Sequence, residues 1–143
     1  MKIYYREKSG GIEILRCFGM GGRVEIPGMI EDKLVVSAAP YAFSSHMDEK
    51  EELKNACLWK VSDGLGFGRE EHVLAGNDVE EIVFPDTLKE IGRYIFYGCG
   101  NLRKLEFSDS LMQIGCGAFT GCHALEKLTV HMRQGKKSGV KEM

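Results

Sequence analysis

The chain lacks a strong excess of charge of either sign. It has 19 Lys and Arg against 21 Asp and Glu in 143 residues, a formal net charge of −2. Proteins that bind nucleic acid or an anionic membrane surface usually carry a clear basic excess or a basic stripe. We therefore expect neither nucleic acid nor a membrane as a partner.

Long apolar runs are also absent. No stretch approaches the length of a membrane-spanning helix. Residues 1–11 contain four charged side chains and no apolar run of the kind found in a signal peptide, the charged ones being Lys2, Arg6, Glu7 and Lys8. As written, the sequence predicts a cytoplasmic protein, and a secreted or cell-surface one if a signal peptide has been removed.

The five cysteines show no paired C-x-x-C spacing. Their number is odd and no export signal accompanies them, so we expect reduced thiols rather than disulfides. Cys116, Cys122 and His123 are the nearest approach to a zinc site, but their spacing does not match one. Cys99 and Cys122 are instead expected to stack as small buried side chains. We expect no metal and no cofactor.

A convergent catalytic set is missing as well. Cys116 with His123 or His131 is the only nucleophile and base close in sequence, and no third group orients the pair. His72 follows two glutamates that would tune a general base, yet it stands in an expected loop. The sequence predicts that the protein is not an enzyme.

What the chain does contain is a repeat of 23 residues between Val79 and Val130. Apolar residues recur in register at this interval, as solenoid proteins require. The repeated sets are Val79, Leu102 and Leu125; Ile82, Leu105 and Leu128; Phe84, Phe107 and Val130; Leu88 and Leu111; Ile91-Gly92 and Ile114-Gly115; Phe96 and Phe119; and Gly98-Cys99 and Gly121-Cys122.

The pattern predicts that each repeat forms a strand followed by a short second segment. Ile82 and Phe84 are two residues apart, so a strand places them on one face and Val83 on the other. The second half, from Ile91 to Phe96, is too short for a helical hairpin and predicts an extended piece with a tight helical or 3₁₀ turn. Stacked units of this kind align their strands into a parallel sheet.

The repeat resembles the BspA-type leucine-rich repeat family. The resemblance rests on Val-Glu-Glu-Ile-Val-Phe-Pro at 79–85 and Ala-Phe-Thr-Gly-Cys at 118–122, and it covers 79–130. The sequence departs from the family pattern at Ile95, where alanine is usual, and at Ser108, where proline is usual. The resemblance implies a role in protein–protein or surface interaction, since many relatives are exported adhesion proteins.

The expected fold class is an α/β repeat solenoid, a right-handed leucine-rich-repeat-like coil. It has a parallel β-sheet on one face, short 3₁₀ or helical turns on the other, and one inserted helix. A single domain spans 1–132, with a diverged first repeat at 12–43, a helical and loop insertion at 44–72, and regular repeats at 79–130. A flexible tail follows at 133–143.

The insertion is expected to form a helix from near Ser45 to about Lys60. Acidic residues crowd its first turns, and Leu53 with Ala56 supplies an apolar stripe. A loop at 64–68, rich in glycine, ends it. Trp59 either pins this helix to the flank of the coil or anchors a partner.

The candidate binding site consists of the strand residues that face away from the core. They carry mostly charges of alternating sign, which suits recognition of a polar protein surface. The residues are Arg23, Glu25, Glu81, Val83, Lys104, Glu106, Lys127 and Thr129.

Three functions remain open at this point. The first is a non-enzymatic module that binds a protein partner through the sheet face. The second is a structural or assembly fragment of a larger repeat family, and catalysis is a remote third. The strand at Leu125–Val130 has no following coil, so this end is either shielded by residues 131–143 or covered by a partner, and a homodimer through it is a further hypothesis.

Overall fold

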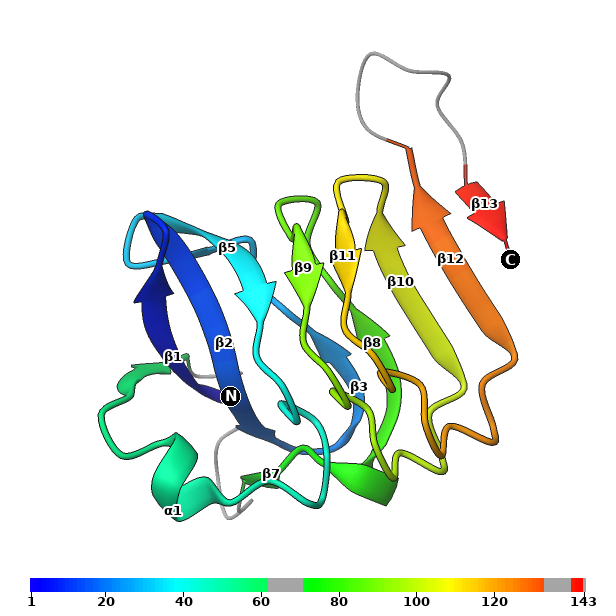
Figure 1. The fold of residues 1–143 in the computed structure, drawn as a ribbon, viewed down its shortest axis with the longest axis horizontal. Helices are drawn as coiled ribbons and strands as arrows, with labels where there is room; N and C mark the ends of the chain where they lie inside the picture. Colours follow the sequence, from blue (N-terminus) through cyan, green and yellow to red (C-terminus); the bar gives the residue numbers. More distant parts are fainter. Residues whose placement is uncertain (62–70, 133–139, 143) are drawn as a thin grey trace.

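The computed structural model describes residues 1–61, 71–132 and 140–142, and Figure 1 shows their arrangement. This part of the chain is mostly β-strand, arranged in two sheets. Sheet B has the order β13-β12-β10-β8-β3, and sheet A has the order β11-β9-β5-β2-β1-β6. Two further short strands join sheet A, where β4 pairs with β5 and β7 pairs with β2. The described residues include one short α-helix and one 3₁₀ helix.

Sheet B carries the 23-residue repeat. Its strands are β3 (Gly22–Glu25), β8 (Val79–Val83), β10 (Lys104–Ser108), β12 (Lys127–His131) and β13 (Val140–Glu142). The strands β3, β8, β10 and β12 run parallel, and Leu105 pairs with Ile82 on one side and Leu128 on the other. Ile82 and Leu105 are fully buried, and Leu128 packs against them half-buried. The predicted alignment of the repeat strands into one parallel sheet is therefore confirmed.

The first repeat also lies where the sequence predicts. Val24 pairs with Ile82 and Glu25 with Val83, which places β3 beside β8 across the intervening 44–72 segment. The repeat is longer than the others because β4 (Met29–Ile30) and β5 (Lys33–Ala38) form a small antiparallel hairpin within it.

Sheet A receives the second half of each repeat. Ala38 of β5 pairs in parallel with Ile91 of β9 (Glu90–Ile91), which pairs with Ile114 of β11 (Gln113–Ile114). The apolar core lies between the two sheets. Within it Phe43 and Phe96 stack with ring centroids 6.1 Å apart, and Phe96 and Phe119 with centroids 5.8 Å apart.

Beyond these short strands the chain forms hydrogen-bonded turns at 93–98 and 116–121. We expected 3₁₀ or helical turns here. The only 3₁₀ helix of the described residues, η1 (Gly76–Asp78), lies instead just before β8. The turns bond from coil to coil, for example from the Tyr94 N–H to the Cys116 carbonyl. These lateral bonds alternate with bonds inside the turn, such as that from the Tyr97 N–H to the Tyr94 carbonyl, so the consecutive internal bonds of a helix do not form.

The amino-terminal hairpin covers the start of the core. Strands β1 (Lys2–Lys8) and β2 (Gly11–Gly19) are antiparallel and joined by a two-residue turn at Ser9 and Gly10, both with positive φ. Such a turn matches the twist of a hairpin. The sequence predicts an opening strand only around 12–14, so the hairpin extends it in both directions.

The predicted helix from Ser45 to Lys60 is wrong in its extent. Helix α1 covers only Glu49–Glu52, and its amino end is capped by the Asp48 side chain. Cys57–Lys60 form strand β6, antiparallel to β1, with Trp59 opposite Ile3. Strand pairing prevails because it occupies the open edge of β1 and lets Trp59 pack against the core. Trp59 thus packs from a strand and not from a helix.

Two of the remaining expectations fall wholly or mostly on residues that the structure does not describe. The loop expected at 64–68 lies there, and so does most of the tail at 133–143. The described part of that tail, Val140–Glu142, forms β13 and pairs antiparallel with β12. β7 (His72–Val73) pairs with the end of β2 and leads the chain back into register. Among the described residues, no helix has the length and apolar character needed to cross a membrane.

Candidate interaction surface

The outward side chains of sheet B form two rows across the strands. Residues two apart on a strand share a face, and the register aligns equivalent positions of neighbouring strands. The strand-start row consists of Arg23, Glu81, Lys104 and Lys127. The strand-end row consists of Glu25, Val83, Glu106 and Thr129. We call the two rows together the charged face.

The charged face contains a shallow groove of about 430 Å³. All of the eight residues expected from the sequence line it except Glu25, together with Ile82. Glu25 stands beside it on the edge strand β3 and is exposed. The structure thus brings the predicted residues onto one surface.

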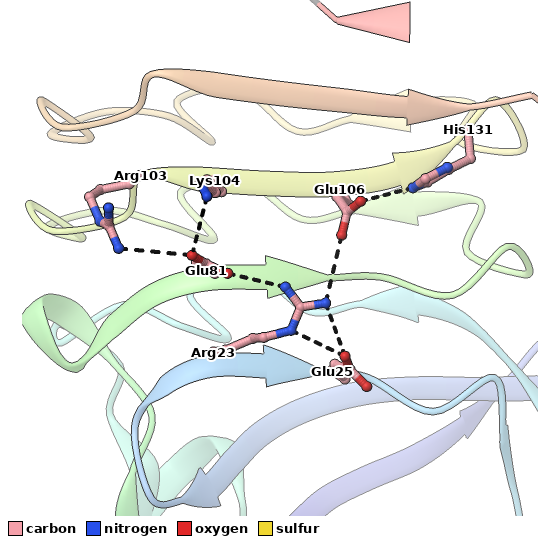
Figure 2. A network of polar contacts seen from close by, with 7 residues as sticks. All are labelled: Arg23, Glu25, Glu81, Arg103, Lys104, Glu106 and His131. Carbon is pink, nitrogen blue, oxygen red and sulfur yellow. Dashed lines mark hydrogen bonds and ion pairs between the residues drawn. The ribbon is translucent and has the colours of Figure 1, made fainter. Parts of the chain in front are cut away.

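Arg23 is the centre of the charge network in Figure 2. Its Nη1 donates to Glu81 Oε2 at 3.1 Å, and its Nε and Nη2 donate to Glu25 Oε1 at 3.1 and 3.0 Å. Its Nη2 also lies 4.0 Å from Glu106 Oε2. One guanidinium therefore links carboxylates from β3, β8 and β10.

The hydrogen bonds of the network favour the charged forms of Arg23 and Glu81. Hydrogen bonds to Glu25 and then Glu81 raise the pKa of the Arg23 guanidinium. The hydrogen bond from Arg23 lowers the pKa of the Glu81 carboxyl, with the charges of Lys104, Arg23 and Arg103 acting in the same direction. Both groups therefore stay ionised well on either side of neutral pH.

Two members of the network were not predicted from the sequence. Arg103 Nη2 lies 3.8 Å from Glu81 Oε1, close to Lys104 Nζ at 3.7 Å from the same oxygen. His131 Nε2 lies 3.0 Å from Glu106 Oε1. Arg103 directly precedes β10, one residue before Lys104, and His131 is the last residue of β12, two residues after Thr129. The 23-residue spacing alone does not predict that the side chains of Arg103 and His131 reach the charged face.

The charged face is polarised along the strand direction. Three cations lie where β10 and β12 begin, namely Arg103, Lys104 and Lys127. The carboxylates of Glu25 and Glu106 lie two residues further along their strands than Arg23 and Lys104, as Figure 2 shows. The side chains of the strand-end row project less from the sheet at two positions, because Val83 is half-buried and Thr129 is only 4% exposed.

The outer side of sheet A carries a buried carboxylate. Glu13 on β2 is 1% exposed and lies 2.7 Å from Arg6 Nη2, 3.0 Å from Lys8 Nζ and 3.3 Å from Ser37 Oγ. Because its charge is fully paired, Glu13 holds β1, β2 and β5 together.

The sequence-derived catalytic candidates do not converge. Across the described residues, no hydrogen bond or ion pair connects Cys116 with His123 or His131. His72 stands on β7, with its Nε2 4.0 Å from Asp78 Oδ2. No group of three potential metal ligands occurs in the described part of the chain.

Of the two cysteines expected to stack as buried side chains, Cys99 is buried and Cys122 is half-buried. The Cys99 thiol donates to the Phe43 carbonyl at 3.2 Å, and the Cys122 thiol donates to the Phe96 carbonyl at 3.4 Å. Burial raises the pKa of the Cys99 thiol to about 12 and that of Cys122 to about 11. Both thiols are therefore protonated and weak nucleophiles at neutral pH.

Comparison with known proteins points to leucine-rich repeats. Residues 70–138 match the family described as "BspA type Leucine rich repeat region (6 copies)". A leucine rich cell surface protein from Faecalibacterium prausnitzii A2-165 is similar in structure, with 20% identity and a TM-score of 0.57 over 89% of this chain and 28% of that one. This likeness supports a repeat fold over most of the chain.

A Leucine Rich Repeat protein from T. pallidum is a second structural match, with 24% identity and a TM-score of 0.38 over 87% of this chain and 66% of that one. The chain thus spans 28% and 66% of the two solved proteins. No curated protein matches the sequence.

Proposed function

Residues 70–138 belong to the BspA-type leucine-rich repeat family, and on this premise we propose that the protein is a non-enzymatic binding module. Its partner is another protein surface, and the charged face of sheet B is where that partner docks. The single observation that carries the proposal is the shared groove of about 430 Å³ lined by Arg23, Glu81, Lys104, Glu106, Lys127 and Thr129.

The chemistry of the groove favours a polar protein partner. Arg23, Lys104 and Lys127 are exposed and extend from strands held in fixed register. Arranged charges of both signs give specificity and fast association more than bulk affinity. Apolar ligands are poorly matched, because only Val83 offers a large apolar side chain among the outward residues of the groove.

We also propose that the protein works at the cell surface or in a secreted form. The supporting observations are the family of residues 70–138 and the likeness to a solved cell surface protein. Brief protease treatment of intact cells tests this, because a surface-exposed chain is degraded before the membrane is breached and an internal one survives.

Affinity capture from native cells with a charge-reversed bait tests the binding site. Lys104→Glu with Glu106→Lys preserves net charge but inverts the polarity of the charged face. Lys50→Glu with Glu52→Lys in α1 is a matched control, because both residues are exposed and far from sheet B in the fold.

We expect wild type and the α1 control to retain the same partner, and the sheet B variant to lose it. Cross-links from the partner should map to β8, β10 and β12. Retention of the partner by the sheet B variant would show that binding occurs elsewhere.

A further inference from the structure

We propose that the charged face also recognises a second copy of this chain, packed face to face with its strands antiparallel. The inference rests on the proposed function, because it uses the same surface. It concerns the kind of partner, and it follows from how charge and side-chain size are distributed along each strand of sheet B.

The charges are self-complementary under a two-fold rotation. Consider an axis that lies parallel to the sheet, crosses the strands and runs over the central line of Val24, Ile82, Leu105 and Leu128. Rotation about it places the strand-start row of one copy over the strand-end row of the other. Lys104 then faces Glu106 of the second copy, and Arg23 faces Glu25.

Each of these contacts occurs twice, because a two-fold interface uses the same patch on both copies. The arrangement gives four pairs of opposite charge from two residues on β3 and two on β10. On the other two strands no like charges face each other, since Glu81 lies over Val83 and Lys127 lies over Thr129.

Side-chain size is complementary under the same rotation. The strand-start row has a long charged side chain on every strand, whereas the strand-end row has Val83 and Thr129 on β8 and β12. These two low positions help to line the groove of about 430 Å³. The exposed Lys127 of the second copy would extend over Thr129, while Glu81, which is 20% exposed and paired within its own copy, would lie over Val83 without a like charge opposite.

Some of the charges needed for the interface are only loosely held within one copy, whereas Arg23 bonds to Glu25 and Glu81 at 3.0 to 3.1 Å and Glu106 to His131 at 3.0 Å, so those bonds must be exchanged when two copies meet. Lys104 and Arg103 lie 3.7 and 3.8 Å from Glu81, and Arg23 lies 4.0 Å from Glu106, all longer than a good charge-assisted hydrogen bond. The Lys104 side chain is 46% exposed and the Glu25 side chain 68% exposed. Exposed pairs contribute little within one chain, so exchanging them for pairs between copies costs little.

Charge-swapped variants give a test that depends on the geometry. With Lys104→Glu alone, the new carboxylate faces Glu106 of the second copy. With Glu106→Lys alone, the new ammonium group faces Lys104 of the second copy. Each change places like charges together twice. Mixing the two variants restores opposite charges at both contacts, and so does combining both changes in one chain.

Sedimentation velocity over a dilution series measures the outcome at low and high salt. We expect wild type to dimerise, more strongly at low salt. Each single variant should dimerise about tenfold more weakly or worse, a loss of 1.4 kcal/mol or more. The equimolar mixture and the double variant should regain near wild-type association.

The proposal is overturned if wild type is monomeric at every concentration, or if the mixture associates no better than the single variants. Circular dichroism shows whether each variant is folded, and Arg23→Glu mixed with Glu25→Arg repeats the test on β3. The capture experiment gives an independent result. If the wild type is monomeric but captures a different protein that the charge-reversed variant does not, the proposed binding function holds and self-recognition does not.

Discussion

Arg16 is the residue on which the first turn of the repeat fold depends. It lies on β2, is 2% exposed, and its Nη1 donates to the carbonyls of Tyr41, Ala42 and Ser44 at 3.2, 3.1 and 2.6 Å. Its Nε donates to Glu49 Oε1 at 3.0 Å. Burial lowers the pKa of the guanidinium, and the hydrogen bond to Glu49 opposes that shift.

We predict that Arg16→Ala destabilises the protein by about 3 kcal/mol, because the carbonyls of Ala42 and Ser44 lose their Arg16 donor inside the structure, while the Tyr41 carbonyl keeps the Ser44 N–H. Urea unfolding measures this. Arg93→Ala is the matched control, since Arg93 is exposed, and it should stay within about 0.5 kcal/mol of wild type. Equal effects of the two variants would contradict the role assigned to Arg16.

The thiols divide into a reactive and an unreactive set. Cys57 and Cys116 are exposed, whereas Cys17 and Cys99 are buried and Cys122 is half-buried. We predict that a thiol reagent modifies Cys57 and Cys116 rapidly in the native protein, and the other three only on unfolding. Peptide mass mapping after a short pulse identifies the modified sites. Rapid labelling of Cys99 would contradict its burial in the core.

The same thiols make stability fall at alkaline pH. Burial raises the pKa of Cys17 and Cys99 from 9.0 to about 12. Below pH 9 both the folded and unfolded chains hold these protons, so the stabilisation is fully present. Above it the unfolded chain releases protons first, so the free energy of unfolding declines as pH rises towards 12.

Cys122→Ala isolates this effect, because the pKa of Cys122 is also raised, to about 11. We predict a shallower alkaline decline in urea-unfolding free energy for Cys122→Ala than for wild type. Cys57→Ser should leave the slope unchanged, since Cys57 is exposed. Identical slopes for all three proteins would argue against burial as the cause.

Among the elements, the short strands of sheet A are fixed by two glycines. A Cβ at Gly92 would lie 2.3 Å from the Pro40 nitrogen, and a Cβ at Gly115 would lie 2.2 Å from the Arg93 nitrogen. Backbone of the preceding coil occupies the space that a side chain needs. The Ile-Gly pair of each repeat therefore sets how closely the coils approach on this side.

We predict that Gly92→Ala destabilises the protein by about 3 kcal/mol, because the backbone of a neighbouring coil must move to admit a methyl group. Gly28→Ala is the control: its nearest contact would be an ordinary 3.6 Å to Pro85, and it should change stability by less than about 1 kcal/mol. Thermal and urea unfolding compare the two, and a neutral Gly92→Ala would contradict this close approach.

At the scale of elements, the sequence predicts what repeats and misses what does not. The strands β8, β10 and β12 follow from the 23-residue period, and β3 follows from its likeness to them. Strand β1 has no repeated counterpart, so its alternating Ile3 and Tyr5 carry little signal alone. The helix expected to run to Lys60 fails because the local stripe of Leu53 and Ala56 competes with the unpaired edge of β1.

The candidate site was predictable as rows but not as a network. Spacing alone assigns Lys104 and Lys127 to one row and Glu106 to the next. It does not give the direction in which Arg23 turns, or bring Arg103 and His131 onto the face. Those placements depend on side-chain contacts between strands far apart in the sequence.

Across the whole molecule, burial decreases from the amino-terminal coils to the last one. Ile91 is 2% exposed but its counterpart Ile114 is 48% exposed, and Leu105 is buried where Leu128 is half-buried. The hairpin of β1 and β2 covers one end of the core. Among the described residues, β11 is the outermost strand at the other end of sheet A.

We predict a matching gradient in hydrogen exchange. Amides of β8 and β10 should exchange slowly, close to the rate set by global unfolding, because both strands are paired on both sides. Amides of β11 should exchange at least about tenfold faster through local opening. Exchange mass spectrometry at peptide resolution measures this, and equal protection in β9 and β11 would contradict local opening at this end.

The pairing of Ile82, Leu105 and Leu128 in one line limits how the gene can change in length. Loss or gain of one codon within a strand moves every later side chain of that strand to the opposite face of the sheet. Loss or gain of 23 codons leaves the alternation of faces unchanged. The hairpin at Met29–Ile30 and Lys33–Ala38 already absorbs extra residues within a coil. Deletions and duplications that preserve the fold should therefore span whole 23-residue repeats or lie within that hairpin.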